Sequence, residues 1–206
     1  MGVRRVLVPG VDRAQWVRAL ELDGGPLALR FAVGVHPRFS GSIADVQSFA
    51  EELDAAAIGE FGWDRSVPAD DALADAHLEL AKSLALPVVL HVVGMHGHAI
   101  ERLRRHDDLC GVVHAYSGSA ELVQAYVALG LHVSIGPSVL EPDARKVHAA
   151  ALAIPSERLL IETDAPDQIS EPAGLVRVAE ALARIRGGSL SELAEVTFAN
   201  AEELFA

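Results

Sequence analysis

The sequence has one cysteine, few basic residues and no long hydrophobic run. Because Cys110 stands alone, no disulfide can form within the chain, which excludes the disulfide-built folds of small secreted proteins. No segment approaches the roughly 20 apolar residues that a membrane-spanning helix needs. The apolar run near the start is too short for a signal peptide, and Pro9 interrupts it. We therefore expect a cytoplasmic protein that makes no membrane contact.

Basic residues are also outnumbered, with 17 Lys and Arg against 29 Asp and Glu and a formal net charge of −12. A protein that coats nucleic acid gains affinity from counterion release and needs the opposite sign. Any nucleic-acid contact here would be local, through metal ions or a small basic patch. What the chain does have is 50% hydrophobic residues over a length of 206, without a linker or a break in composition. This favours one sizeable core, and we predict a single domain over residues 1–206.

Short apolar runs alternate with helical patterns along the whole chain. Such runs, closed by turn residues, are typical of strands buried on both faces; they occupy 3–8, 27–35, 56–61, 87–92, 110–115, 131–135 and 158–162. Helical spacing covers 72–84, 100–103, 120–129, 172–185 and 190–205, and the N-cap candidates are Ser42, Asp70, Ser119 and Ser189. Strands alternating with helices predict parallel βαβ units in an α/β fold.

Seven strands are one fewer than a (β/α)8 barrel contains. We therefore predict a barrel that is one βα unit short. An open edge would leave backbone hydrogen-bonding groups unpaired, which favours self-association. The chain is accordingly expected to form a homo-oligomer through that edge.

Five ionisable residues fall at predicted strand ends. His36, Glu60, His91 and His114 end the second to fifth strands, and Asp164 closely follows the seventh. In a parallel barrel these ends share one face, where active sites lie, and imidazoles with carboxylates suit Zn²⁺, Mn²⁺ or Mg²⁺. Each residue also has an ordinary interpretation: a hydrogen-bonded core histidine, a loop cap at Glu60, or a turn former at Asp164. Their coincidence on successive strand ends favours a functional cleft.

Several segments occur in the order typical of one family. They are GVHP (34–37), IGEFGWD (58–64), LELAKSLALPVVLH (78–91), VVHAYSGS (112–119), LGLHVSIG (129–136), IPSERLLIETDAP (154–166) and NAEELF (200–205). In these segments the chain resembles the TatD family of metal-dependent hydrolases. The resemblance implies a TIM-type (β/α) barrel, one or more Mg, Mn or Zn ions, and hydrolysis of phosphodiester bonds in DNA, or in a small phosphodiester, by a metal-activated water.

The resemblance also implies roles for individual residues. Glu60 would bridge two metal ions, with His91, His114 and Asp164 as further ligands. Asp164 would in addition be the catalytic residue that activates the attacking water. The candidate substrate contacts are His36 and Trp63, of which Trp63 could stack on a base or simply pack as a rim aromatic.

The chain departs from the family pattern at several places. No His-x-His pair stands near the start, so the resemblance implies that the first βα unit and two metal ligands are absent. Val93 occupies a place where the family tends to carry an arginine, and His77 a place where it often carries glutamine. The pair at 96 and 98 has the right local sequence for replacement ligands, although solvated residues at a helix start are the favoured interpretation.

Three functions remain open at this stage. The first is a TatD-type hydrolase working with a reduced ligand set, and the second is a catalytically degenerate scaffold that binds a partner. The third is another metal-dependent barrel hydrolase acting on a small ester, amide or lactone. Several members of that third group would be expected to carry a carbamylated lysine at a strand end, whereas Lys82 and Lys146 both lie in helical stretches. The third function is therefore the weakest.

Overall fold

A computed structural model gives the fold and describes residues 3–205. The chain divides into two compact units, one running from Val3 to Gly111 and the other from Val112 onward. The single domain over 1–206 stays a prediction, and its residues 1, 2 and 206 lie outside the described part.

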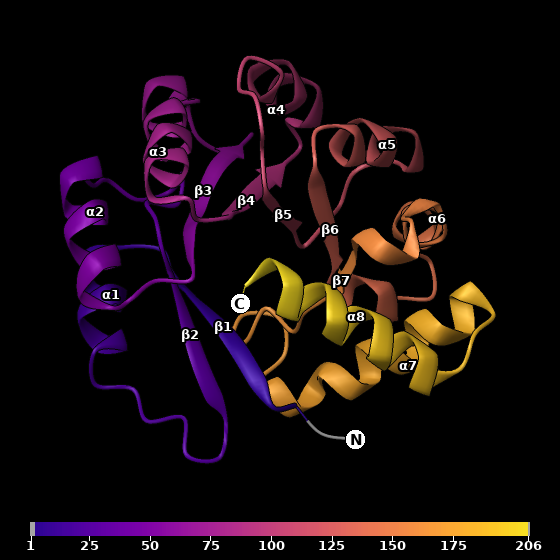
Figure 1. Cartoon of the computed structure of the whole chain (residues 1–206). Coiled ribbons are helices and arrows are strands. Elements are labelled where there is room, and N and C mark those ends of the chain that lie inside the picture. The colour runs from indigo at the N-terminus through magenta and orange to yellow at the C-terminus, as the bar shows by residue number, and fades with distance from the viewer. Residues whose placement is uncertain (1–2, 206) are drawn as a thin grey trace. The chain divides into compact units, whose positions relative to one another are not determined.

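The first unit consists of four strands, each followed by a helix. The strands are β1 (Arg5–Gly10), β2 (Ala28–Val33), β3 (Ala57–Asp64) and β4 (Val88–Val93). They pair in chain order, and every pairing is parallel. The helices are α1 (Arg13–Ala19), α2 (Ile43–Glu52), α3 (Asp71–Leu84) and α4 (His96–Leu103). Each helix packs on the strand that precedes it (Figure 1). Because the strands are parallel, their carboxyl ends lie at the same edge of the sheet.

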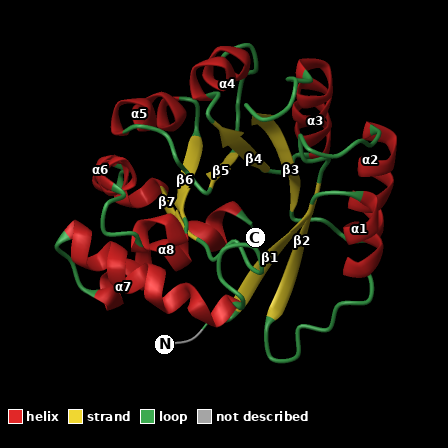
Figure 2. Ribbon diagram, turned by 180° about the vertical axis from the view of Figure 1, so that it is seen from behind, coloured by secondary structure: helices red, strands yellow, loops and turns green. Residues whose placement is uncertain are grey.

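The second unit continues the alternation. Its strands are β5 (Gly111–His114), which begins at the last residue of the first unit, β6 (Leu131–Ile135) and β7 (Leu159–Ile161). Its helices are α5 (Ala120–Ala128), α6 (Arg145–Ala153), α7 (Leu175–Arg186) and α8 (Leu190–Leu204), with short 3₁₀ helices η1 (Pro137–Leu140), η2 (Ser156–Arg158) and η3 (Pro172–Gly174). β6 and β7 pair in parallel, and Figure 2 separates these strands from the surrounding helices by colour.

Helix α8 is fixed to β7 by a side chain of the NAEELF segment. The amide nitrogen of Asn200 donates to the carbonyl oxygens of Ser156 and Leu159, each at 2.8 Å. The Ser156 carbonyl belongs to η2 and the Leu159 carbonyl to the first residue of β7, so this buried amide satisfies two backbone acceptors where the chain enters the strand. Asn200 therefore has a structural role in this fold.

The predicted elements are confirmed with shifts of at most four residues at their ends. All seven strands and the five helical stretches are present among residues 3–205. The side chains of Ser42, Asp70 and Ser189 cap α2, α3 and α8 by accepting a backbone N–H, and Ser189 completes a capping box with Glu192. Ser119 is the N-cap of α5 but makes no side-chain capping bond.

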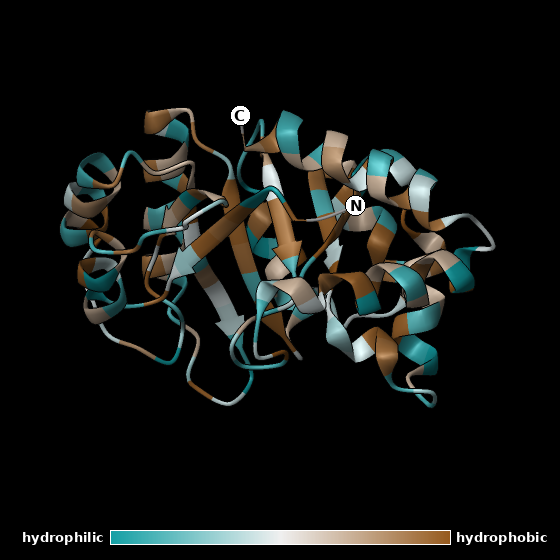
Figure 3. Cartoon of the chain, turned by 90° about the horizontal axis from the view of Figure 1, so that it is seen from below, coloured by the Kyte–Doolittle hydropathy of each residue, from teal (hydrophilic) through white to brown (hydrophobic). Residues whose placement is uncertain are grey.

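Burial follows the strands. Residues of β3, β4, β5 and β6 are almost all buried, and in Figure 3 the strands are mainly brown while the outer helix surfaces carry the teal, hydrophilic residues. Strands buried on both faces are typical of parallel sheets covered by helices. No helix within residues 3–205 combines the length and apolar character that crossing a bilayer requires.

Candidate metal centre

Glu60 is placed by a β-bulge in β3. In the ladder with β4, Gly59 lies opposite Val89 and Phe61 opposite Leu90, so Glu60 has no partner between them. A bulge of this kind re-aims one side chain out of the regular alternation, and bulges are common beside active sites. The bulge therefore turns the Glu60 carboxylate out of the regular alternation near the middle of β3.

A glycine brings the strand of Glu60 close to that of His91. A Cβ atom at Gly62 would lie 2.2 Å from the carbonyl oxygen of His91, and the φ of +143° at this position also disfavours other residues. Only glycine allows this backbone approach, and it sets the distance between β3 and the end of β4. The second glycine of the IGEFGWD segment thus shapes the site.

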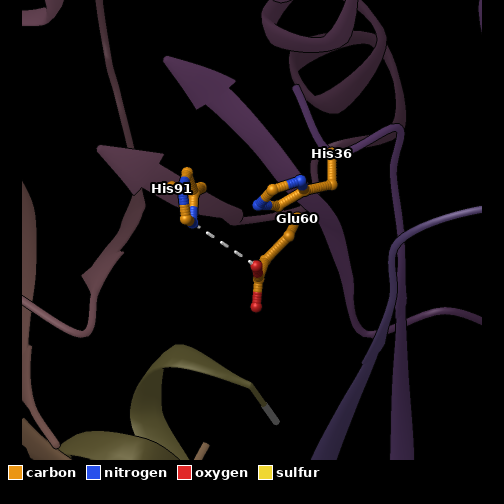
Figure 4. Close-up of side chains that lie close together, drawn as sticks. All are labelled: His36, Glu60 and His91. Atoms are coloured by element: carbon orange, nitrogen blue, oxygen red, sulfur yellow. Dashed lines mark ion pairs between the residues drawn. The ribbon is translucent and has the colours of Figure 1, made fainter. Parts of the chain in front are cut away.

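Three side chains of the first unit converge at this place. One potential ligand atom from each of His36, Glu60 and His91 lies within 4.8 Å of those of the other two. Figure 4 shows the two rings and the carboxylate pointing toward one another from the loop after β2, from β3 and from β4. His91 Nδ1 lies 3.8 Å from Glu60 Oε2, and the ring centroids of His36 and His91 are 4.2 Å apart. The cluster is largely buried.

The other nitrogen of His91 faces a buried carboxylate. His91 Nε2 lies 3.4 Å from Asp64 Oδ2, and because a carboxylate only accepts, Nε2 is the donor. The neutral ring then keeps its lone pair on Nδ1, the nitrogen that faces Glu60. Metal-binding histidines commonly have this arrangement, in which a carboxylate fixes the tautomer behind the ligand nitrogen.

Asp64 itself is strongly held in its ionised form. Burial alone would raise its pKa, but the backbone N–H and hydroxyl of Ser66, the His91 ring and the Arg38 guanidinium together hold the pKa of this carboxyl well below its usual range. The Ser66 backbone N–H donates to Oδ1 at 2.9 Å. A permanent negative charge behind His91 increases the basicity of the ligand nitrogen.

His36 and His91 carry their ring proton on nitrogens that play different roles in the cluster. The backbone N–H of Arg38 donates to His36 Nδ1 at 3.2 Å, so Nδ1 is an acceptor and the proton of the neutral ring lies on Nε2. This tautomer presents an N–H donor to the cluster in place of a ligand lone pair. His36 is therefore better suited to donate to an oxygen bound in the site than to coordinate a metal ion.

The chemistry of these groups fits a divalent cation. Glu60 supplies a buried carboxylate and His91 an oriented imidazole nitrogen, a mixed donor set that Zn²⁺ and Mn²⁺ accept. Burying a carboxylate costs free energy unless an opposite charge lies nearby, and a bound cation would supply such a charge. The first unit thus brings together residues that could hold a metal ion.

Two further predicted ligands belong to the second unit. His114 ends β5 and is buried, and its Nδ1 lies 3.4 Å from Glu162 Oε1, the residue after β7. Asp164 lies two residues farther on, where it accepts from the Gln168 side chain at 2.6 Å and adopts a left-handed backbone conformation with a φ of 49°. His114 therefore has a carboxylate behind one ring nitrogen, as His91 has in the first unit.

Trp63 does not present a free ring face. Its side chain is completely buried, and its indole N–H donates to Asp71 Oδ1 at 2.9 Å. Base stacking would need an accessible ring face. In this structure Trp63 packs between β3 and the start of α3, in agreement with the interpretation as a packed aromatic.

The histidines at 96 and 98 lie away from the triad of His36, Glu60 and His91. They open α4, and His98 Nε2 lies 2.7 Å from Asp71 Oδ1 while its ring meets that of Trp63 edge-on. A carboxylate of α3 thus contacts His98 and links α4 to α3, and neither residue of the pair belongs to the cluster of His36, Glu60 and His91.

Sequence reasoning missed Asp64, Glu162 and Arg38. Asp64 stands in the segment IGEFGWD, a few residues after Glu60. Glu162 stands in the segment LLIETDAP, a few residues before Asp164. Each carboxylate lies beside a histidine of a different strand. That contact depends on how the strands pair, which the spacing of residues along one strand does not reveal. Arg38 offered no sequence signal beyond its place after GVHP.

Comparisons with known proteins show the family to which the chain is related. The family model described as TatD related DNase matches residues 1–206. The chain is 32% identical to an Escherichia coli K12 protein named "uncharacterized metal-dependent hydrolase YjjV", over 99% of this chain and 87% of that protein. It is likewise 32% identical to a Rahnella protein named "3'-5' ssDNA/RNA exonuclease TatD", over 100% of this chain and 88% of that protein.

Solved structures confirm the fold. The crystal structure of Escherichia coli YjjV matches with a TM-score of 0.88, over 98% of this chain and 86% of that one. An uncharacterized TIM-barrel protein of Bordetella bronchiseptica, only 14% identical, matches with a TM-score of 0.61 over 97% of this chain and 79% of that one, which shows the fold alone. The predicted TIM-type (β/α) barrel is confirmed, and it defines the class of the protein. Within that class, the chain belongs to the TatD family of metal-dependent hydrolases.

Proposed function

We propose that this protein hydrolyses phosphodiester bonds of DNA with a divalent metal ion bound at Glu60 and His91. The observation that carries the proposal is the convergence of these two side chains with His36 in the first unit. The buried Asp64 carboxylate beside His91 Nε2 supports it, because histidines that bind metal ions commonly have such a carboxylate partner. The related Rahnella protein, by its name an exonuclease for single-stranded DNA and RNA, makes single-stranded DNA the first substrate to examine.

The resemblance to the family supplies the rest of the proposed centre. On that ground we include His114 and Asp164, with Asp164 as the residue that accepts a proton from the attacking water. A bound metal ion would lower the pKa of a water molecule and withdraw charge from a phosphoryl oxygen. His36, with its proton on Nε2, would donate a hydrogen bond to an oxygen of the bound phosphate. Asp64 keeps the His91 ring in the tautomer that has its lone pair on Nδ1.

The test is a cleavage assay with a labelled single-stranded oligonucleotide in Mn²⁺ or Mg²⁺. We expect cleavage that a chelator abolishes and that falls at least about 100-fold in Asp164→Asn and in Glu60→Gln, because each removes a charge from the site at nearly constant shape. Each variant is compared with the wild-type protein in its circular dichroism spectrum. Cleavage that survives both substitutions would show a contaminating nuclease and refute the proposal.

The competing function is a degenerate scaffold that binds a partner without chemistry. Absence of cleavage together with saturable metal binding would favour a metal-dependent hydrolase with another substrate, such as a small phosphodiester. Absence of both cleavage and metal binding would favour the scaffold. The same preparation of protein therefore separates the two functions.

A further inference from the structure

Arg38, in the loop after β2, is held in place by Asp64. Its Nε donates a hydrogen bond to Asp64 Oδ2 at 2.9 Å, and its Nη2 forms an ion pair with the same oxygen at 2.8 Å. The Asp64 side chain is 1% exposed, whereas that of Arg38 is 56% exposed. The carboxylate is thus a buried anchor, and the guanidinium is an oriented cation at the surface.

The anchor uses only part of the guanidinium. The Nε hydrogen bond and the Nη2 ion pair use one edge of the guanidinium and go to one oxygen, and within residues 3–205 the Nη1 group has no protein partner. Arginine carries five N–H donors in a planar fork, which matches two oxygens of a phosphate or carboxylate. A half-exposed guanidinium whose orientation is already fixed loses little side-chain entropy when it binds an anion.

The position of Arg38 ties it to the candidate metal centre. Asp64 Oδ2, the oxygen that holds the guanidinium, also lies 3.4 Å from His91 Nε2. The backbone N–H of Arg38 holds His36. Arg38 is therefore linked to two members of the cluster: its backbone bonds directly to His36, and its side chain shares the Asp64 carboxylate with His91.

A cavity of about 430 Å³ opens beside this cation. It is lined by Arg38 and Phe39 from the loop after β2 and by Phe61 from β3, among others. Phe39 is 45% exposed, and the centroid of its ring lies 6.0 Å from that of the His36 ring. The cavity thus combines a cation at its rim with an accessible aromatic ring.

We propose that Arg38 and Phe39 form a nucleotide subsite, in which Arg38 binds phosphoryl oxygens of the substrate and Phe39 stacks on the adjoining base. This inference rests on the proposed function and names the residues that select its substrate class. A chain with a net charge of −12 repels a polyanion, so it needs a local cation at the place of reaction. Phe39 supplies the base contact that the buried Trp63 does not offer.

The first test measures binding without any metal. Chelator-treated protein is titrated calorimetrically with inorganic phosphate and then with deoxyadenosine 5′-monophosphate. We expect saturable binding of both, weakened about tenfold or more in Arg38→Gln and less in Arg38→Lys, which keeps the charge but loses the fork. Arg105→Gln is the matched control, because it removes an exposed arginine that pairs with Glu101 on α4.

Stacking by Phe39 is tested by a separate comparison of two ligands. Phe39→Leu should leave the affinity for inorganic phosphate unchanged and lower the affinity for the nucleotide about fivefold or more. Equal loss for both ligands would refute the stacking role. Phosphate binding that Arg38→Gln does not weaken, or no phosphate binding by the wild type, would overturn the subsite.

These outcomes are distinguishable from failure of the proposed function. If the protein cleaves DNA, Arg38→Gln should raise KM about tenfold or more while its Mn²⁺ affinity stays at the wild-type value. If the protein binds phosphate through Arg38 yet cleaves nothing, the subsite stands and the hydrolase proposal fails. If it cleaves DNA and Arg38→Gln leaves both KM and phosphate binding unchanged, the hydrolase stands and the subsite fails.

Discussion

Acid should destabilise the first unit through His77, a completely buried residue of α3. The backbone N–H of Val35 donates to its Nε2 at 3.1 Å, so the neutral ring carries its proton on Nδ1, which donates to the Leu73 carbonyl at 2.7 Å. The ring also stacks on Phe61 with 4.6 Å between the centroids. A second proton would have to displace the Val35 bond and place a charge in the core.

The size of the effect follows from the shifted pKa. Burial lowers the pKa of His77 from 6.5 to about 4, despite the opposing hydrogen bond to Leu73. Below pH 6.5 the unfolded chain takes up a proton that the folded chain refuses, so the free energy of unfolding falls as the pH falls toward 4. At 1.36 kcal/mol per pH unit, the loss reaches ~2 kcal/mol near pH 5 and ~3 kcal/mol near pH 4.

The assay is urea unfolding at several pH values between 7.5 and about 4, followed by circular dichroism. The reference variant is His77→Gln, whose amide can accept from Val35 and donate to Leu73 without titrating. We expect the wild type to lose ~2 kcal/mol relative to this variant between pH 7.5 and about 5. Parallel stability curves for the two proteins would refute the reasoning, because all other titrating groups are common to both.

Three further predictions concern the site and its surroundings. Asp64→Asn should weaken Mn²⁺ binding about 10- to 100-fold in a calorimetric titration, because the His91 tautomer is no longer fixed by a charge; unchanged affinity would show that Asp64 serves Arg38 alone. Gly62→Ala should lower the free energy of unfolding in urea by about 2–4 kcal/mol, because the new Cβ meets the His91 carbonyl. The control Gly97→Ala, at an open position of α4, should lower it by nothing, and equal stabilities of the two variants would contradict the packing argument. Self-association through the edge of β1 should appear in light scattering as a mass that rises with concentration, and a constant monomer mass would exclude it.

Much of the fold was accessible from the sequence because its signals are local. Apolar runs bounded by turn residues identified all seven strands, and three of the four N-cap candidates cap their helices with side-chain bonds. Glu60 and His91 lie close together as predicted, but neither ends its strand, because β3 continues to Asp64 and β4 to Val93. Their proximity follows from the pairing of neighbouring parallel strands.

The rest of the site depends on contacts between strands and on hydrogen bonds that no spacing reveals. The bulge at Glu60 arises from the register of β3 against β4. The proton on His36 Nε2 depends on a backbone N–H two residues away, and the exposure of Phe39 depends on how its loop folds. Trp63 could not be placed from its position in the segment, because its burial follows from the packing of α3 on β3.

A calorimetric titration of the wild-type protein with Mn²⁺ tests the central claim most directly. Glu60→Gln and His91→Asn are run beside it, since each removes one ligand with a small change of shape. The account predicts saturable binding by the wild type that both variants weaken at least about tenfold, while Arg105→Gln binds as the wild type does. Absence of binding by the wild type, or binding that survives both substitutions, would contradict a metal centre built on Glu60 and His91.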